Sequence, residues 1–287
     1  MKNIYFYSLL FLLGINLFVW GVIFAFIYRP LGEVDFLNVG QGDAELIQME
    51  AGNILIDAGP NREVVSALDK VLPFFDRTID VFILSHPNQD HYAGFFDVLD
   101  RYQVRAVVLN NLDCPNSLYQ QLLQEIRKRN ITVLSGLTGT RIRSKDSPSQ
   151  LLIIHPSHLA TMNDNADEFS SVDILSLGGK QFLFTGDIGF QEEKELIPLL
   201  SLLPAGERIL KVAHHGSRYA SSQTFLEAFS PQIAVIEVGN NNYGHPHPDT
   251  LQRLKDAQVK VLRTDLDGSI RFIFPSSQEM YLQSQKF

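Results

Sequence analysis

The segment 85–91 carries three groups that bind metals, His86, Asp90 and His91, within six residues. A β-branched and apolar run, residues 79–84, leads directly into it. Loops at the C-terminal ends of buried strands hold functional groups on a rigid scaffold, so this placement favours a site over a core. Imidazole and carboxylate groups are ligands of divalent ions. The segment therefore predicts one part of a metal site.

Three further loops carry similar groups, and each follows an apolar strand. Six of the eight histidines lie in three strand-end loops, namely His86 and His91, His214 and His215, and His245 and His247. The fourth loop holds Asp187, which in isolation reads as a turn residue or a helix N-cap. Core histidines are not expected to collect at strand ends. Together these loops predict a site for one or two divalent ions with open positions for water.

The elements that must position these loops are strands at first, and then strands and helices in alternation. The apolar and β-branched runs predict strands at 34–39, 44–49, 53–57, 79–84, 106–109, 131–134, 151–156, 170–177, 181–185, 208–213, 233–238, 259–263 and 269–274. Helical spacing predicts helices near 63–72, 95–101, 117–129, 192–203, 223–229 and 249–257. In a sandwich of two sheets, the loops could supply their side chains to one rim.

The amino terminus differs from the rest of the chain. Residues 4–28 contain no charged residue, and the run is long enough to cross a hydrocarbon core of about 30 Å as a helix. A cleaved signal peptide has a shorter apolar core and a small-residue cleavage site, and a run that is apolar on all faces suits a membrane span better than a helix of a soluble protein. We therefore expect an uncleaved transmembrane anchor at 1–29 and one globular domain at 30–287.

Composition excludes several classes of function. The formal net charge is −8, so the chain is a poor candidate for binding duplex DNA by charge alone. Cys114 is the single cysteine, which excludes a disulfide framework and a multi-cysteine zinc site. This composition is compatible with an enzyme that binds the phosphate of its substrate through a metal ion.

Six motifs in order resemble the metallo-β-lactamase superfamily, and most closely the hydrolase domain at the carboxyl end of the ComEC family of competence proteins. The matching motifs are FLNVGQGDA at 36–44, LIDAG at 55–59, LSHPNQDH at 84–91, FTGDI at 184–188, KVAHHGS at 211–217 and GHPHP at 244–248. The resemblance covers about 34–274. It implies an α+β fold, an αββα sandwich with the site at one sheet edge, and metal-dependent hydrolysis.

The resemblance also implies roles for single residues. It implies metal ligands at His86, Asp90, His91, Asp187, His215 and His247. It implies catalytic roles for Asp90, for the bridging Asp187 and for His215, as a ligand or as the acid that protonates the leaving group. Supporting or alternate positions are Asp43, Asp57, Asn88, Ser171, His214 and His245, of which the first two would orient the ligands.

The sequence departs from the superfamily in two places. Asn88 stands where the second histidine of the His-x-His-x-Asp-His pattern would be. The superfamily's histidine between that loop and the bridging aspartate has no counterpart, and Ser170 and Ser171 stand nearest. Both losses fall on the first metal position. We therefore expect one tightly bound ion, manganese or zinc, on the side of Asp90, His91, Asp187 and His247, and a second ion that is weak or absent.

These features predict a membrane-anchored phosphodiesterase of nuclease type that acts on single-stranded DNA, as in competence DNA uptake. The hydrolase domain would lie outside the cytoplasmic membrane, and a DNA-uptake channel protein would be a partner. One alternative is a hydrolase of another ester or lactone. The other is a non-catalytic partner module with a degenerate site, which Asn88 keeps open.

Overall fold

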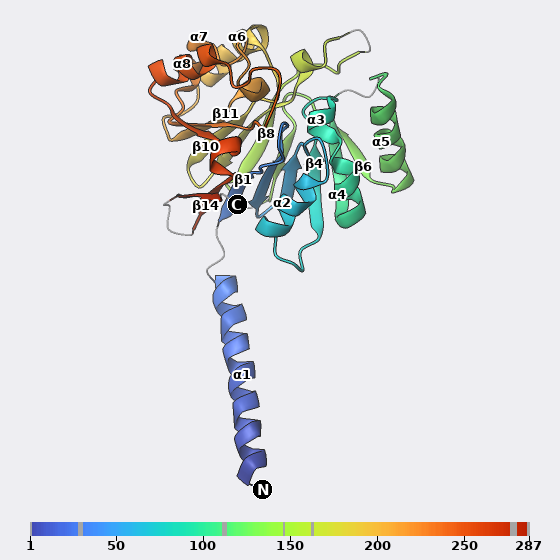
Figure 1. Cartoon of the computed structure of the whole chain (residues 1–287), viewed down its shortest axis with the longest axis vertical. Coiled ribbons are helices and arrows are strands. Elements are labelled where there is room, and N and C mark those ends of the chain that lie inside the picture. The colour runs from blue at the N-terminus through green and yellow to red at the C-terminus, as the bar shows by residue number, and fades with distance from the viewer. Residues whose placement is uncertain are drawn as a thin grey trace.

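Two β-sheets form the centre of the molecule, and helices cover the sandwich on both sides (Figure 1). The computed structural model describes residues 2–27, 31–110, 114–145, 147–161, 164–275 and 280–285. The αββα sandwich that the sequence predicts is confirmed.

The first sheet has eight strands in the order β15-β14-β1-β2-β3-β4-β5-β6. Their bounds are β1 (Gly32–Phe36), β2 (Glu45–Met49), β3 (Gly52–Ile56), β4 (Thr78–Ile83), β5 (Gln103–Leu109), β6 (Thr132–Ser135), β14 (Ser269–Phe274) and β15 (Tyr281–Gln285). The strands from β3 to β6 are parallel, and α2 (Glu63–Val71), α4 (Phe95–Arg101) and α5 (Ser117–Lys128) connect them. The parallel half of the sheet therefore turns its strand ends toward one edge.

The second sheet has seven strands in the order β13-β12-β11-β10-β9-β8-β7. Their bounds are β7 (Arg141–Arg143), β8 (Gln150–His155), β9 (Val172–Leu177), β10 (Lys180–Phe184), β11 (Arg208–Lys211), β12 (Ile233–Ile236) and β13 (Lys260–Arg263). The strands from β10 to β13 are parallel, and they are connected by α6 (Phe190–Leu200), α7 (Gln223–Phe229) and α8 (Pro248–Asp256).

Three apolar clusters separate the four layers. In β3, Ile54 and Ile56 belong to the cluster between the sheets, whereas Leu55 belongs to the cluster under α2, α4 and α5. In β10, Phe184 faces the other sheet and Leu183 faces α6 and α7. This alternation follows from the two-residue period of a strand, and both faces of each sheet are buried.

Several short elements lie outside the sequence prediction. They are α3 (Gln89–Tyr92), β7, the 3₁₀ turns Asp167–Phe169 and Ala213–Gly216, α9 (Thr264–Asp267) and β15. The segment of α9 reads as a loop because it holds Asp265 and Asp267 and is followed by Gly268. The edge strand β15 is rich in glutamine and serine and has no apolar alternation that would reveal it.

Residues of the apolar amino terminus form one helix, α1 (Lys2–Ile27), which lies outside the sandwich (Figure 1). Within the residues that the structure describes, no helix combines the length and the apolarity that crossing a membrane requires.

Candidate metal centre

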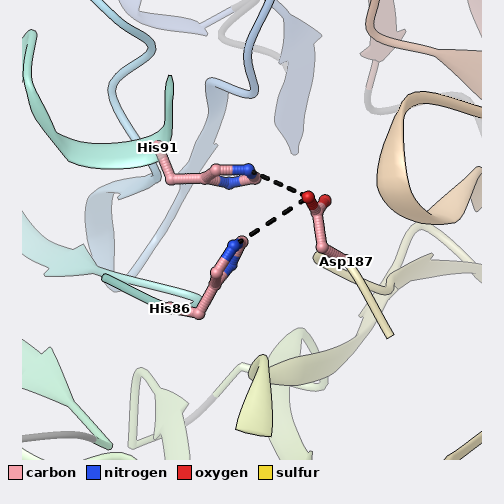
Figure 2. A group of neighbouring side chains, drawn as sticks. All are labelled: His86, His91 and Asp187. Carbon is pink, nitrogen blue, oxygen red and sulfur yellow. Dashed lines mark ion pairs between the residues drawn. The ribbon is translucent and has the colours of Figure 1, made fainter. Parts of the chain in front are cut away.

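Two buried histidines point at one buried aspartate where the two sheets meet (Figure 2). The Nε2 atoms of His91 and His86 lie 3.4 Å and 3.9 Å from Oδ2 of Asp187. The histidines come from the loop and short helix that follow β4, and Asp187 follows β10 of the other sheet. Strands of both sheets therefore end at the same rim and bring together residues that are about a hundred positions apart in the chain.

A second group adjoins the first and shares His91. His215 Nε2 lies 3.3 Å from Asp90 Oδ2 and 3.9 Å from Asp187 Oδ2. The ligand atoms of Asp90, His91 and His215 all lie within 4.8 Å of one another, as do those of His86, His91 and Asp187. The structure thus gathers five of the six predicted metal ligands around one point.

Hydrogen bonds on the far side of the rings fix their orientation. His91 Nδ1 donates to Asp57 Oδ2 at 2.7 Å, and Ser85 Oγ donates to the same oxygen at 2.6 Å. His215 Nδ1 donates to the carbonyl oxygen of Glu237 at 2.9 Å. Both rings therefore direct Nε2 into the site, which is the arrangement that histidine ligands of metals commonly show. Asp57 accepts this bond at a position where the resemblance implies an orienting residue.

Burial and charge set the protonation of these groups. Burial, together with the neighbouring His91, lowers the pKa of His86 to about 3, so this imidazole is neutral near pH 7. Burial would lower the pKa of His215, but the carboxylates of Asp43 and Asp187 raise it to about 10. Burial would raise the pKa of Asp187, yet His91 and His215 hold it well below its usual range. A metal that binds His215 must therefore displace a proton.

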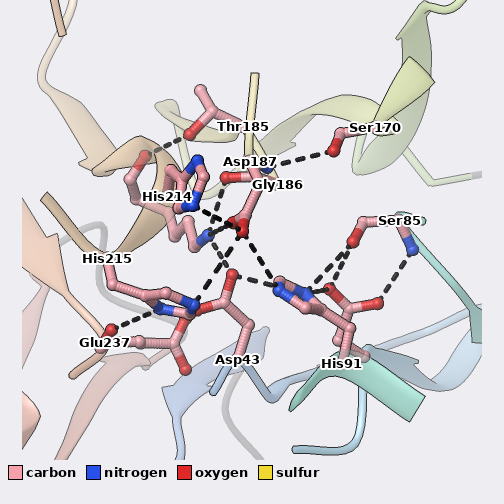
Figure 3. Close-up of polar contacts among 12 residues, drawn as sticks. Asp43, Ser85, His91, Ser170, Thr185, Gly186, Asp187, His214, His215 and Glu237 are labelled. Atoms are coloured by element: carbon pink, nitrogen blue, oxygen red, sulfur yellow. Dashed lines mark hydrogen bonds and ion pairs between the residues drawn. The ribbon is translucent and has the colours of Figure 1, made fainter. Parts of the chain in front are cut away.

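A buried ion pair of Lys211 with Asp43 adjoins the ligands, and Figure 3 shows Asp43 beside His215 and His91. Lys211 Nζ contacts the carboxylate of Asp43, donates to the carbonyl oxygen of Gly186 at 2.9 Å and lies 3.8 Å from Asp187 Oδ1. Asp43 Oδ1 in turn lies 3.2 Å from His215 Nδ1. Asp43 therefore contacts both the buried lysine and a predicted ligand. The sequence reasoning missed Lys211, although a lysine within an otherwise apolar strand is a visible signal.

Unpartnered polar atoms show that the site fits a divalent ion. His86 Nε2, His91 Nε2 and Asp187 Oδ1 are buried and have no hydrogen-bond partner among the described residues. Leaving a buried polar group without a partner costs about 1–3 kcal/mol, so such groups call for an explanation. Imidazole nitrogens and carboxylate oxygens together are ligands of zinc and manganese. An ion held by these atoms would satisfy all three.

The backbone around the site adopts φ angles that residues other than glycine rarely adopt. Asp57, His214 and His215 have φ angles of 54°, 50° and 52°, in the left-handed region. Such positions cost of the order of 1–3 kcal/mol each and cluster at functional sites. At Gly42, with φ of 151°, a Cβ atom would lie 2.3 Å from the carbonyl oxygen of Asp90. Only glycine allows the 40–44 loop to pack against the ligand loop this closely.

The remaining predicted residues have different surroundings. His247 is the N-cap of α8, where Nδ1 accepts from the backbone N–H of Asp249 at 3.1 Å, and among the described residues it joins no group that could hold a metal. His214 Nε2 lies 3.8 Å from Asp187 Oδ2 at the exposed side of the site. His245 packs its ring against that of His214, and burial, together with His214, lowers its pKa to about 4. His245 therefore adjoins the site through His214.

The two serines that stand near the missing histidine do not offer a replacement ligand. Ser170 Oγ accepts from the backbone N–H of Asp187 at 3.1 Å, and Ser171 Oγ donates to Asp173 at 3.1 Å. Instead, Asn88 Nδ2 donates to Asp167 Oδ1 at 2.8 Å. The sequence indicates an exposed acidic loop over 163–169, and this contact of Asp167 was missed. An aspartate three residues before Ser170 is the only signal for it in the sequence.

Comparisons with known proteins agree with this fold. Residues 37–159 match the family described as the metallo-beta-lactamase superfamily. The structure resembles the metallo-beta-lactamase fold protein YhfI from Bacillus subtilis with a TM-score of 0.56 and 14% identity, over 84% of this chain and 99% of that chain. The chain therefore carries a metallo-β-lactamase superfamily domain.

Within this class, the chain is 31% identical to ComE operon protein 3 of Bacillus subtilis over 269 residues, 86% of this chain and 34% of that protein. The resemblance to the ComEC family of competence proteins is thereby confirmed. The chain is also 27% identical to the endoribonuclease ysh1 of Emericella nidulans over 203 residues, 63% of this chain and 22% of that protein. The chain spans about a third of the length of the first relative.

Proposed function

We propose that this protein is a metal-dependent phosphodiesterase of nuclease type that cleaves single-stranded DNA. The observation that carries the proposal is the buried group of His86, His91 and Asp187, whose ligand atoms converge without hydrogen-bond partners among the described residues. Asp90 and His215 extend this group toward the surface, since the Asp90 side chain is 36% exposed.

Each residue around the site would have a separate role in the reaction. His86, His91 and Asp187 would hold a divalent ion, which when bound would supply polarisation of a phosphoryl oxygen and activation of water. Asp57 keeps His91 in the tautomer whose Nε2 faces the site. His215 Nε2 faces Asp90 and either binds the ion or holds a proton for the leaving oxygen, because Nδ1 is already engaged by Glu237. His214, at the exposed side, is the alternate donor.

We infer the substrate from the sequence similarity to the relatives and from the net charge of the chain. The ComEC-like relative and a relative named as an endoribonuclease favour cleavage of a phosphodiester bond. With a net charge of −8, the chain has little electrostatic affinity for duplex DNA. A flexible single strand can enter the site and be held through the metal. The substrate would thus be bound mainly at the site itself.

Membrane anchoring is part of the proposal. The described apolar side chains of α1 are exposed, including Phe11 at 70% and Phe18 at 73%. An exposed apolar surface of this kind indicates a membrane or a partner protein. We propose that α1 holds the hydrolase domain at the outer face of the cytoplasmic membrane, next to a DNA-uptake channel. Membrane fractionation of cells that express the full chain, followed by protease treatment of intact spheroplasts, tests this placement.

The activity test is degradation of labelled single-stranded DNA by the purified full chain with Mn²⁺ or Zn²⁺. Asp90→Ala should abolish cleavage, whereas Asp256→Ala, which removes an exposed carboxylate on α8, should cleave like the wild type. Equal cleavage by Asp90→Ala would overturn the proposal. A chain that takes up metal but cleaves only other esters or lactones would reassign the substrate. A chain that takes up no metal would favour the non-catalytic partner module.

A further inference from the structure

A row of three rings leads from the candidate metal centre to the surface. His214 Nε2 lies 3.8 Å from Asp187 Oδ2, and Figure 3 shows this imidazole beside the aspartate. The His214 ring contacts the His245 ring with 5.6 Å between their centroids, and the centroid of the Tyr243 ring lies 6.0 Å from that of His245. Tyr243 is 76% exposed. The row therefore begins at a predicted metal ligand and ends at an exposed aromatic ring.

Asn241 holds the loop that presents the tyrosine. Its Oδ1 accepts from the backbone N–H groups of Tyr243 and His245 at 3.0 Å and 3.1 Å. Its Nδ2 donates to the carbonyl oxygens of Gly239 and His245, both at 2.9 Å. Gly239 packs so closely on Gly40 that a Cβ atom at position 239 would lie 2.4 Å from the carbonyl carbon of Gly40. The loop after β12 is thus fixed to the scaffold, whereas the tyrosine ring is left open to solvent.

The exposed ring is better explained by a ligand than by the fold. A ring with this exposure buries little apolar surface, so it adds little to the hydrophobic stabilisation of the protein. A ring on a loop that is already fixed loses little conformational freedom when a flat ligand stacks on it. Unpaired nucleobases are ligands of this kind, and single-strand binding proteins stack them on aromatic side chains.

We propose that Tyr243 stacks on an unpaired base of the single-stranded substrate, beside the phosphate that is cleaved at the metal centre. This inference rests on the proposed function and adds the feature of the strand that is recognised. The bases of a duplex cover one another's faces, so Tyr243 would distinguish a single strand from a duplex. With a net charge of −8, the chain gains little from attraction to phosphates, and stacking would supply much of its affinity for the strand.

The test measures binding of a labelled single-stranded oligothymidylate to the full chain with Mn²⁺ by fluorescence anisotropy. Phosphorothioate linkages protect the strand from cleavage. Tyr243→Ala should weaken binding by about 5- to 150-fold, the loss expected for one base stacked on an aromatic side chain. Tyr243→Phe keeps the ring and should bind like the wild type. The matched control Tyr281→Ala removes another exposed tyrosine, on the edge strand β15, and should also bind like the wild type.

A strand of the same length without bases separates stacking from a change in the shape of the loop. The wild type and Tyr243→Ala should bind this abasic strand with the same affinity, because neither can stack on it. Circular dichroism melting checks that each variant is folded. In steady-state cleavage of unmodified single-stranded DNA, Tyr243→Ala should raise KM and leave kcat unchanged, since it removes binding that the ground state and the transition state share.

The results separate this inference from the proposed function. A wild-type chain that neither binds nor cleaves single-stranded DNA would overturn both. A wild type that cleaves the strand, with Tyr243→Ala binding as tightly as the wild type, would overturn the role of Tyr243 alone. An equal loss in Tyr243→Ala and Tyr243→Phe, or an equal loss of Tyr243→Ala on the abasic strand, would overturn it as well.

Discussion

Replacement of Lys211 by methionine tests whether the buried ion pair stabilises the rim of the sandwich. The variant leaves the carboxylate of Asp43 buried without its lysine and the carbonyl oxygen of Gly186 without its donor. At an effective dielectric constant of about 20, charges 3.8 Å apart, the separation of Lys211 Nζ and Asp187 Oδ1, interact by about 4 kcal/mol. Breaking a buried pair from one side costs about 3–5 kcal/mol, and we expect Lys211→Met to lose that much free energy of unfolding.

A double-mutant cycle separates the pair from the cost of each side chain. Asp43→Asn alone should also be destabilising, because it leaves the lysine charge buried. The double variant should lose much less than the sum of the two single losses, with a coupling of about 3 kcal/mol. The assay is urea unfolding of the metal-free full chain followed by circular dichroism, since Trp20 is the single tryptophan and lies in α1. Arg105→Met, which breaks an exposed pair with Asp80, is the control and should cost at most about 1 kcal/mol. Additive losses would refute the reasoning.

Three further predictions concern protons, backbone and metal. Burial raises the pKa of Asp173 from its usual value near 3.8 to about 8, so the contribution of this group to stability is complete below pH 3.8 and is lost as the pH rises toward 8. The free energy of unfolding of Asp173→Asn should therefore rise relative to that of the wild type by up to about 1.4 kcal/mol per pH unit across that window. Curves of unfolding free energy against pH that run parallel for the two proteins would contradict this. Gly42→Ala should destabilise the chain by about 1–3 kcal/mol and weaken Mn²⁺ binding, because its Cβ would meet the carbonyl oxygen of Asp90; calorimetry with an unchanged affinity would refute it. Mn²⁺ at a hundredfold excess over its Kd should raise the free energy of unfolding by about 2.7 kcal/mol, and chelation should reverse the gain, as thermal melts can show.

The fold could be predicted from local patterns because most strands are short apolar runs bounded by glycine and polar turns. The ligand loops could be predicted for a related reason. His86, Asp187 and His215 each follow such a run, and parallel strands deliver their ends to one rim. Of the site residues that were missed, Asp167 depends on a tertiary contact with no local signature. Asp167 reads as one of several acidic loop residues until the fold places it beside His86.

Lys211 illustrates the same limit from inside the core. Its strand reads as apolar, and the lysine is explained only by Asp43, 168 positions away. The role of His247 shows the reverse problem, since a motif histidine can be engaged locally. Its Nδ1 accepts from the first turn of α8, a contact that a proline and an aspartate after it could have suggested. The spacing of residues in the sequence therefore predicts the location of the site more readily than the role of each side chain in it.

The arrangement of the ligands across two sheets has a mechanical consequence. His86 and His91 belong to the half of the chain that builds the first sheet, and Asp187 and His215 to the half that builds the second. At the rim, where the apolar layer between the sheets ends, an ion bound to both pairs would act as a staple across the seam. Loss of the ion should then loosen the rim first, with amide hydrogen exchange rising at the ends of β4 and β10 before the strand centres open. Exchange protection at these strand ends would therefore measure whether a bound ion holds the two sheets together at the rim.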